Sequence, residues 1–196
     1  MKKGIQFIAI AIICTAITGC KQSTCNNAAN SNENNPTESK SLNLEESIGK
    51  FLTDSIGSHY SPGEVCIPVV TITDADSTDM SDIKAWGDFW VFNYDVSGDT
   101  LKTVSGGSHP GMFHLIKNAE GYQVTAFDGV EDGSRYMPSA KRIFGDRYDA
   151  FSAINGDEAK REELRRAAIE AYVKAKGMSV TMYQDFGWPT HAIKQQ

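Results

Sequence analysis

The sequence predicts an α+β fold, with an antiparallel sheet of about four to six strands and helices packed on one face. A helical segment begins at Asn43, apolar residues then alternate with polar ones in several runs between residues 63 and 127, and helical spacing returns from Pro138 to Lys176. Consecutive strands without helices between them favour antiparallel pairing, because parallel neighbours need a long crossover connection. This order of elements is therefore typical of an α+β domain.

The first helix is predicted from its cap and its apolar spacing. Asn43 is a good N-cap residue, and Glu46 three positions later completes a capping box. Gly57 is the expected end of the helix. The apolar residues at helical spacing are Leu44, Ile48, Phe51 and Leu52.

Six strands are predicted from period-two alternation and from short turns that contain glycine. The first begins near Gly63, and Pro68 favours an edge position because proline has no N–H to donate. The second is the longest, and on it Trp86, Trp90, Phe92 and Tyr94 share one face; such a row is typical of a core surface under a helix, with stacking on sugar rings as the alternative. The later strands are predicted at 83–96, 100–105, 112–117, 122–127 and 178–184.

The helices of the second half are predicted from their end signals. Pro138 fits the first turn of a short helix that ends at Gly145, and Asp157 caps a long helix that ends at Gly177. The expected apolar stripe of the long helix is Leu164, Ala168, Ala171, Tyr172 and Ala175. Its basic residues alternate with glutamates and are expected to face solvent: Arg161, Arg165 and Arg166. By analogy, a cystatin-like or NTF2-like topology fits this order.

The N-terminus has the parts of a secretory signal, with two lysines followed by an apolar run too short to span a bilayer. The sequence AITGC that ends at Cys20 resembles the lipobox of bacterial lipoproteins, in which the cysteine is diacylated on sulfur. The resemblance implies that Cys20 anchors the chain to a bilayer in the cell envelope, on the periplasmic side. A plain secretory peptide with a chance cysteine is the alternative.

Three regions follow from these patterns. Residues 1–19 are expected to be a lipoprotein signal peptide, residues 20–42 a lipidated cysteine with a flexible Asn-rich tether, and residues 43–196 one globular domain. A disulfide between Cys25 and Cys66 is one expectation, and a buried free thiol at Cys66 is the other.

The middle of the chain resembles a second family. A GY strand at 121–124, followed by the pattern DGS.Y.PS.K.IF at 132–144, resembles the extracytoplasmic domain of bla-regulator-type membrane metallopeptidases. This resemblance implies a fold and a location but no activity. The zinc motif His-Glu-x-x-His of those peptidases is not in the sequence, so proteolysis does not carry over.

Composition and motifs indicate a binding domain more than an enzyme. With 19 Lys and Arg against 25 Asp and Glu, the formal charge is −6, which argues against nucleic acid as a partner. No cofactor motif, metal set or catalytic constellation is recognisable in the sequence, so we expect a non-catalytic domain of binding or sensory type. Its partner would be an envelope protein, a peptide or a small ligand.

Five residues are candidates for ligand or partner contacts: His109, Asp132, Arg135, Tyr136 and Trp188. The alternative function is an envelope hydrolase whose residues converge around His109, Asp132 and Tyr136. Catalytic groups must reach one another at hydrogen-bond range, so the relative positions of these three separate the two hypotheses. Phe186 and Trp188 are also expected to clamp the C-terminal chain to the core.

Overall fold

The structure, a computed structural model, describes residues 41–194. The expected signal peptide, Cys20, Cys25 and the tether up to residue 40 lie outside the described residues. The three expected regions and the choice between disulfide and free thiol therefore stay predictions.

Helix α1 (Leu44–Phe51) begins at the predicted capping box. The Asn43 side chain accepts a hydrogen bond from the Glu46 N–H at 2.8 Å, and the Glu46 carboxylate accepts one from the Asn43 N–H at 3.0 Å. The helical path continues past α1 through a π turn (Leu52–Ile56) and a 3₁₀ turn (Gly57–His59). The helix does not stop at Gly57, where a Cβ would lie 2.9 Å from the Cys66 sulfur, so close packing against the sheet requires this glycine.

The sheet is built around β2, which pairs with three other strands. β1 runs along one edge of β2, while β3 and β4 follow each other along the other edge; β5 pairs with β4, β6 with β3 and β7 with β6. The mostly antiparallel sheet confirms the α+β class, and β7 is the strand that the sequence does not predict. The strands are β1 (Val65–Asp76), β2 (Ile83–Ser97), β3 (Thr100–Ser108), β4 (Gly111–Asn118), β5 (Gly121–Gly129), β6 (Met182–Gln184) and β7 (His191–Ala192).

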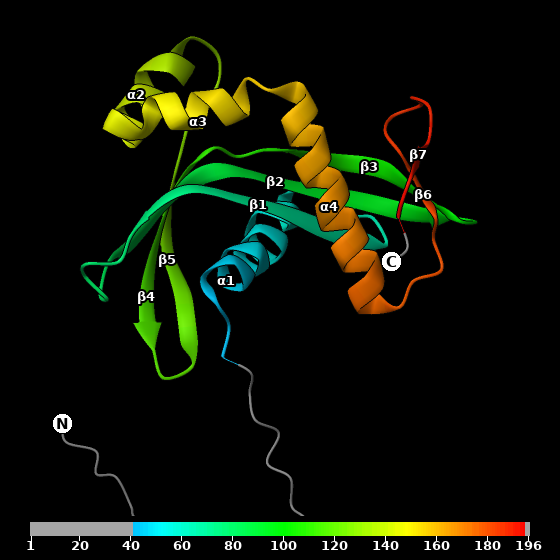
Figure 1. The fold of residues 1–196 in the computed structure, drawn as a ribbon, viewed down its shortest axis with the longest axis horizontal. Helices are drawn as coiled ribbons and strands as arrows, with labels where there is room; N and C mark the ends of the chain where they lie inside the picture. Colours follow the sequence, from blue (N-terminus) through cyan, green and yellow to red (C-terminus); the bar gives the residue numbers. More distant parts are fainter. Residues whose placement is uncertain (1–40, 195–196) are drawn as a thin grey trace, which may run out of the picture. The chain divides into compact units, whose positions relative to one another are not determined.

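The sheet divides where β3 ends and β4 begins. β3 pairs with Trp90–Ser97 of β2 and β4 with Ile83–Gly87, and between them the His109 N–H donates to the Phe89 carbonyl at 2.6 Å. The β4–β5 hairpin points away from the line of β3 (Figure 1). The two parts of the sheet thus extend in different directions from β2.

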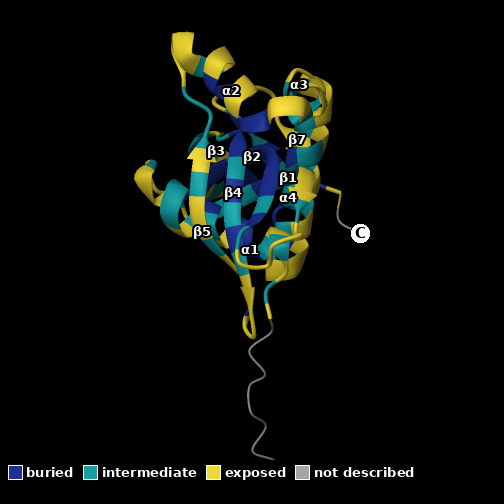
Figure 2. Cartoon of the chain, turned by 90° about the vertical axis from the view of Figure 1, so that its left-hand side faces the viewer, coloured by how far each residue is buried: buried dark blue, intermediate teal, exposed yellow. Residues whose placement is uncertain are grey.

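Helices cover both faces of the sheet, so the expectation that they share one face is wrong for α1. On β2, Phe89 and Val91 belong to the cluster that packs under α1, whereas Phe92 and Tyr94 belong to the cluster under α4. Successive residues of a strand point to opposite faces of the sheet. A strand with apolar residues on both faces therefore needs other elements packed against each face. The buried residues accordingly concentrate in the central strands, between the helices (Figure 2).

The second half forms three helices, α2 (Tyr136–Phe144), α3 (Tyr148–Asn155) and α4 (Glu158–Lys176), with 3₁₀ turns at Gly133–Arg135 and Gly145–Arg147. The predicted end of α2 at Gly145 and the predicted start and end of α4 at Asp157 and Gly177 are confirmed. The Asp157 side chain accepts from the Lys160 N–H at 2.9 Å, and Gly177 closes α4 with a left-handed φ of 61°. No helix of the described part of the chain is long and apolar enough to cross a membrane.

The buried stripe of α4 differs from the predicted one. Arg165, Ile169 and Val173 are its buried residues, whereas Ala171 and Ala175 are exposed. The prediction counted only apolar residues, and the structure places an arginine on the inner face of the helix. α4 crosses the long strands on the face opposite α1 (Figure 1).

Candidate functional site

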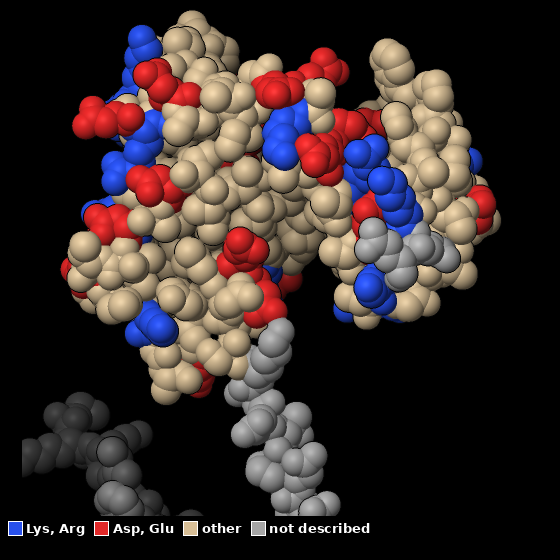
Figure 3. Space-filling view, in the orientation of Figure 1, with Lys and Arg blue, Asp and Glu red and all other residues tan. Residues whose placement is uncertain are grey.

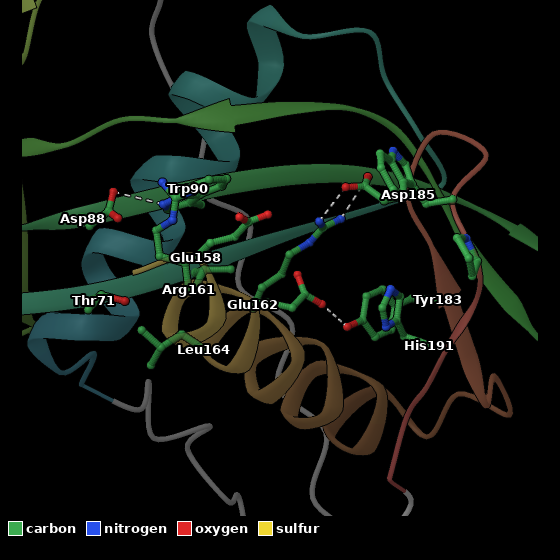
Figure 4. Close-up of a pocket in the computed structure, with 14 residues that line it drawn as sticks. Thr71, Asp88, Trp90, Glu158, Arg161, Glu162, Leu164, Tyr183, Asp185 and His191 are labelled. Atoms are coloured by element: carbon green, nitrogen blue, oxygen red, sulfur yellow. Dashed lines mark hydrogen bonds and ion pairs between the residues drawn. The ribbon is translucent and has the colours of Figure 1, made fainter. Parts of the chain in front are cut away.

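A cleft of about 590 Å³ lies between the first half of α4, one face of β1 and β2, and the chain around β6 and β7 (Figure 4). Cavities of about 300 to 1,000 Å³ are typical of small-molecule sites. The lining residues come from β1 (Val69, Thr71), β2 (Asp88, Trp90), α4 (Glu158, Arg161, Glu162, Leu164, Arg165) and the C-terminal chain (Tyr183, Asp185, Trp188, Pro189, His191).

Three arginines stack on the aromatic row that β2 presents to this side of the sheet. We call them the stacked arginines. Each contributes a cation–π contact, which fixes the plane of a guanidinium group and therefore the direction of its N–H donors. The pairs, with distances from the guanidinium carbon to the ring centroid, are Arg147 over Trp86 (3.9 Å), Arg161 over Trp90 (4.8 Å) and Arg165 over Phe92 (3.9 Å).

The aromatic row is mostly core, as predicted. Trp86, Phe92 and Tyr94 are buried, and Trp90 is half-buried at the floor of the cleft. The Arg161 guanidinium lies over the Trp90 ring, and both side chains line the cleft.

Arg165 is buried, so the expectation that it faces solvent is wrong. Its guanidinium donates to Asp185 at 2.9 and 3.3 Å, to the Thr103 hydroxyl at 3.0 Å and to the Tyr94 hydroxyl at 3.1 Å. Burial disfavours its charge, but the hydrogen bonds with Asp185 and Tyr94 outweigh burial and raise the pKa of Arg165. A buried charge is tolerated only with such pairing, so Asp185 is required where Arg165 enters the core.

Asp88 is a second buried charged group, at the other end of the cleft. It accepts hydrogen bonds from the Trp90 indole at 3.0 Å, the Ser108 hydroxyl at 3.2 Å and the Asn155 amide at 3.4 Å. Burial raises the pKa of Asp88, against these hydrogen bonds. Its oxygens are thus engaged by protein donors that join β2, β3 and α3.

The C-terminal chain forms the mouth of the cleft through a tight turn. The Trp188 N–H donates to the Asp185 carbonyl at 2.7 Å, and Phe186 and Gly187 have positive φ angles of 37° and 85°. Phe186 and Trp188 have 65% and 69% of their surfaces exposed, so the expected clamp onto the core is wrong. The chain is held instead by the Asp185 ion pair and by the buried Tyr183.

Of the five predicted contact residues, Trp188 alone lines the cleft. His109 hydrogen-bonds with the Tyr60 hydroxyl at 3.0 Å; burial lowers the pKa of His109, and the charge of Asp132 opposes this. The Tyr136 hydroxyl donates to Asn155 at 3.0 Å, and the exposed Arg135 pairs with Glu131.

The expected convergence of His109, Asp132 and Tyr136 gains no support from these contacts. Within residues 41–194, no hydrogen bond or ion pair joins any two of them. Asp132 precedes the 3₁₀ turn without a side-chain cap, near enough to His109 to act on it electrostatically. The hydrolase alternative stays a prediction.

The aspartates at the end of β1 and in the loop before β2 hydrogen-bond with other residues of the chain. Asp76 and Asp79 accept hydrogen bonds from residues two positions later, and Asp82 hydrogen-bonds with His114 at 2.7 Å. In the described part of the chain, no group of three or more His, Cys, Asp or Glu side chains is arranged to hold a metal ion.

The fold and the cleft define a class of protein, an α+β domain with a small-molecule-sized cleft between a helix and its sheet. Compared with protein-family models, with curated proteins and with solved structures, the chain matches none. The lipobox at Cys20, the resemblance at 132–144 and the cystatin-like or NTF2-like topology stay predictions.

Sequence reasoning missed most of the cleft. Arg161 and Arg165 were not candidates, because a basic run among glutamates resembles an exposed helix face. Asp185 was not a candidate because its partner Arg165 lies 20 positions away in the sequence. One signal was present: Arg165, Ile169 and Val173 share the spacing of one helix face, which places an arginine in line with two apolar residues.

Proposed function

We propose that the chain is a lipid-anchored protein of the bacterial envelope whose domain binds a small ligand, without catalysis, in the cleft under α4. The anchoring rests on the lipobox pattern at Cys20, and the binding rests on the cleft. The domain would act on the periplasmic side of a membrane, as a binding or sensory module.

The observation that carries the binding proposal is that the cleft is preformed. Its polar groups are fixed by partners from different elements: Arg165 by Asp185, Asp88 by Trp90 and Ser108. Small-molecule sites combine apolar walls with a few polar groups held in place before the ligand arrives, which keeps the entropic cost of binding low. Val69 and Leu164 supply apolar wall here.

The three tryptophans of the chain provide a test in solution. The Trp90 and Trp188 indoles line the cleft, whereas Trp86 donates its indole N–H to the Ile143 carbonyl at 2.9 Å in the core and does not line the cleft. The full chain, labelled with ¹⁵N, would be titrated with a library of small ring compounds. Ligand binding in the cleft is expected to shift the Trp90 and Trp188 signals while the Trp86 signal stays.

Two results would contradict the proposal. One is that no compound of the library moves the Trp90 and Trp188 signals. The other is that compounds which do so move the Trp86 signal equally, because that result indicates a change of the whole fold.

A further inference from the structure

Two of the three stacked arginines have a carboxylate partner within the chain. Arg147 donates through Nε to Asp74, and Arg165 donates through both terminal nitrogens to Asp185. The Nε of Arg165 is also used, by the Tyr94 hydroxyl. In each case an aromatic ring on one side fixes the guanidinium, and its N–H edge meets an acceptor.

Arg161 stacks on an aromatic ring, but its N–H groups have no hydrogen-bond acceptor in the described chain. Its guanidinium stacks on Trp90, yet no hydrogen bond or ion pair joins it to another residue of the described chain. Its Nε is the one side-chain nitrogen or oxygen within residues 41–194 that is buried without a hydrogen-bond partner. An unsatisfied buried donor is unfavourable. The terminal nitrogens of Arg161, which lines the cleft, also have no hydrogen-bond partner in the described chain, so they are the donors that a ligand in the cleft meets.

The carboxylates around Arg161 do not fill this position. Asp88 accepts from three donors, Asp185 is paired with Arg165, and Glu162 accepts from the Tyr183 hydroxyl. Glu158, three positions before Arg161 on α4, lines the cleft and has no hydrogen bond or ion pair to another described residue. These negative charges favour a ligand with one negative charge over one with two.

We propose that Arg161 binds the carboxylate of a small organic acid whose apolar part lies in the cleft between Leu164, Val69 and Trp188. The proposal rests on the proposed function and names the class of its ligand. The ligand carboxylate completes on Arg161 the arrangement of ring, arginine and carboxylate that the chain itself completes on Arg147 and Arg165. Bonds between arginine and carboxylate are among the stronger hydrogen bonds in proteins, so the acid is selected over its uncharged analogue.

The test uses two probes with the same ring and chain length, 3-phenylpropionate and 3-phenylpropanamide. The acid is expected to bind the full chain about tenfold more tightly than the amide, read from the Trp90 and Trp188 indole signals with Trp86 as the internal reference. Phenyl phosphate, with a second negative charge, is expected to bind more weakly than 3-phenylpropionate.

Variants test whether the Arg161 side chain causes the preference for the acid over the amide. Arg161→Gln is expected to reduce the preference of acid over amide to less than about twofold. Arg166→Gln, on the same helix but outside the cleft, is expected to keep it. Arg161→Lys keeps the charge without the planar donors and is expected to retain only part of the preference.

Each failure has a distinct meaning. Equal binding of acid and amide at Trp90 and Trp188 would overturn the carboxylate proposal and leave the cleft as a binding site. No shift with either probe or with any library compound would overturn both proposals. If Arg161→Gln does not fold, the comparison of 3-phenylpropionate with 3-phenylpropanamide on the unaltered chain still tests whether the cleft prefers a carboxylate.

Discussion

At the scale of residues, the ion pair between Arg165 and Asp185 joins α4 to the C-terminal chain and closes one end of the cleft. The Arg165 side chain is 9% exposed and the Asp185 side chain 31%. Removing one partner of a buried pair costs more than the pair contributes, because the remaining charge stays buried without compensation.

Asp185→Asn is therefore expected to lower the free energy of unfolding by about 2 kcal/mol, less than for a fully buried pair because Asp185 is partly exposed. Asp146→Asn, at an exposed position, is the matched control and is expected to change it by less than about 0.5 kcal/mol. Urea unfolding measures both variants. Equal losses would show that Asp185 does not stabilise Arg165.

A second residue-scale contact makes stability depend on pH. The hydrogen bond with Asp82 at 2.7 Å raises the pKa of His114; partial burial opposes it, and Asp128 at 3.4 Å adds to it. A raised folded-state pKa stabilises the protein fully below the unfolded pKa of histidine, about 6.5. The contribution is lost as the pH rises through the folded-state pKa.

His114→Gln is accordingly expected to lower Tm more at pH 5 than at pH 9. His59→Gln removes an exposed histidine and serves as the control for other titrating groups. A His114→Gln effect on Tm that is the same at both values of pH would rule out the ion pairs as its cause.

At the scale of elements, two glycines are present for different reasons. One lies too close to a neighbouring strand for a side chain, and the other lies in a helix with room for one. A Cβ at Gly87 of β2 would lie 2.2 Å from the Thr71 carbonyl oxygen, which is backbone and cannot rotate away. A Cβ at Gly49, inside α1, would lie 3.4 Å from the Pro68 ring. The first glycine is required by its neighbours and the second is not.

Gly87→Ala is expected to cost about 3 kcal/mol or more, and Gly49→Ala to be neutral or to stabilise by up to about 1 kcal/mol, since alanine favours a helix interior. Thermal and urea unfolding of the two variants test this directly. A Gly87→Ala variant as stable as the parent chain would show that β1 and β2 are farther apart than the structure places them.

The elements that sequence predicts well are those with local causes. The capping box at Asn43, the stop at Gly177 and the alternation of β2 each depend on residues within a few positions. The prediction of helices on one face was wrong because it considered only the aromatic face of β2, whereas Phe89 and Val91 on the other face are apolar as well and pack under α1. The Phe186 and Trp188 turn was missed because positive φ at a non-glycine residue follows from tertiary contacts such as the Asp185 ion pair.

At the scale of the whole molecule, the net charge of the chain and the proposed lipid anchor at Cys20 have opposite effects on membrane association. The chain has a formal charge of −6, and acidic and basic side chains alternate over α4 without a broad basic surface in this view (Figure 3). An anionic membrane surface attracts polybasic segments and not an acidic domain. If Cys20 is acylated as proposed, stable association with a membrane would depend on its acyl chains, each buried methylene adding about 0.8 kcal/mol.

Cys20→Ala is expected to move the protein from the membrane fraction to the soluble fraction of the envelope. Cys66→Ala is the matched control, because Cys66 is half-buried in β1 and its loss is expected to leave fractionation unchanged. Metabolic labelling with a fatty acid is expected to mark the parent chain and the Cys66→Ala variant but not the Cys20→Ala variant. If Cys20→Ala still fractionates with membranes at high salt, the lipobox assignment is wrong, because an acidic domain offers no electrostatic attraction to replace the lipid.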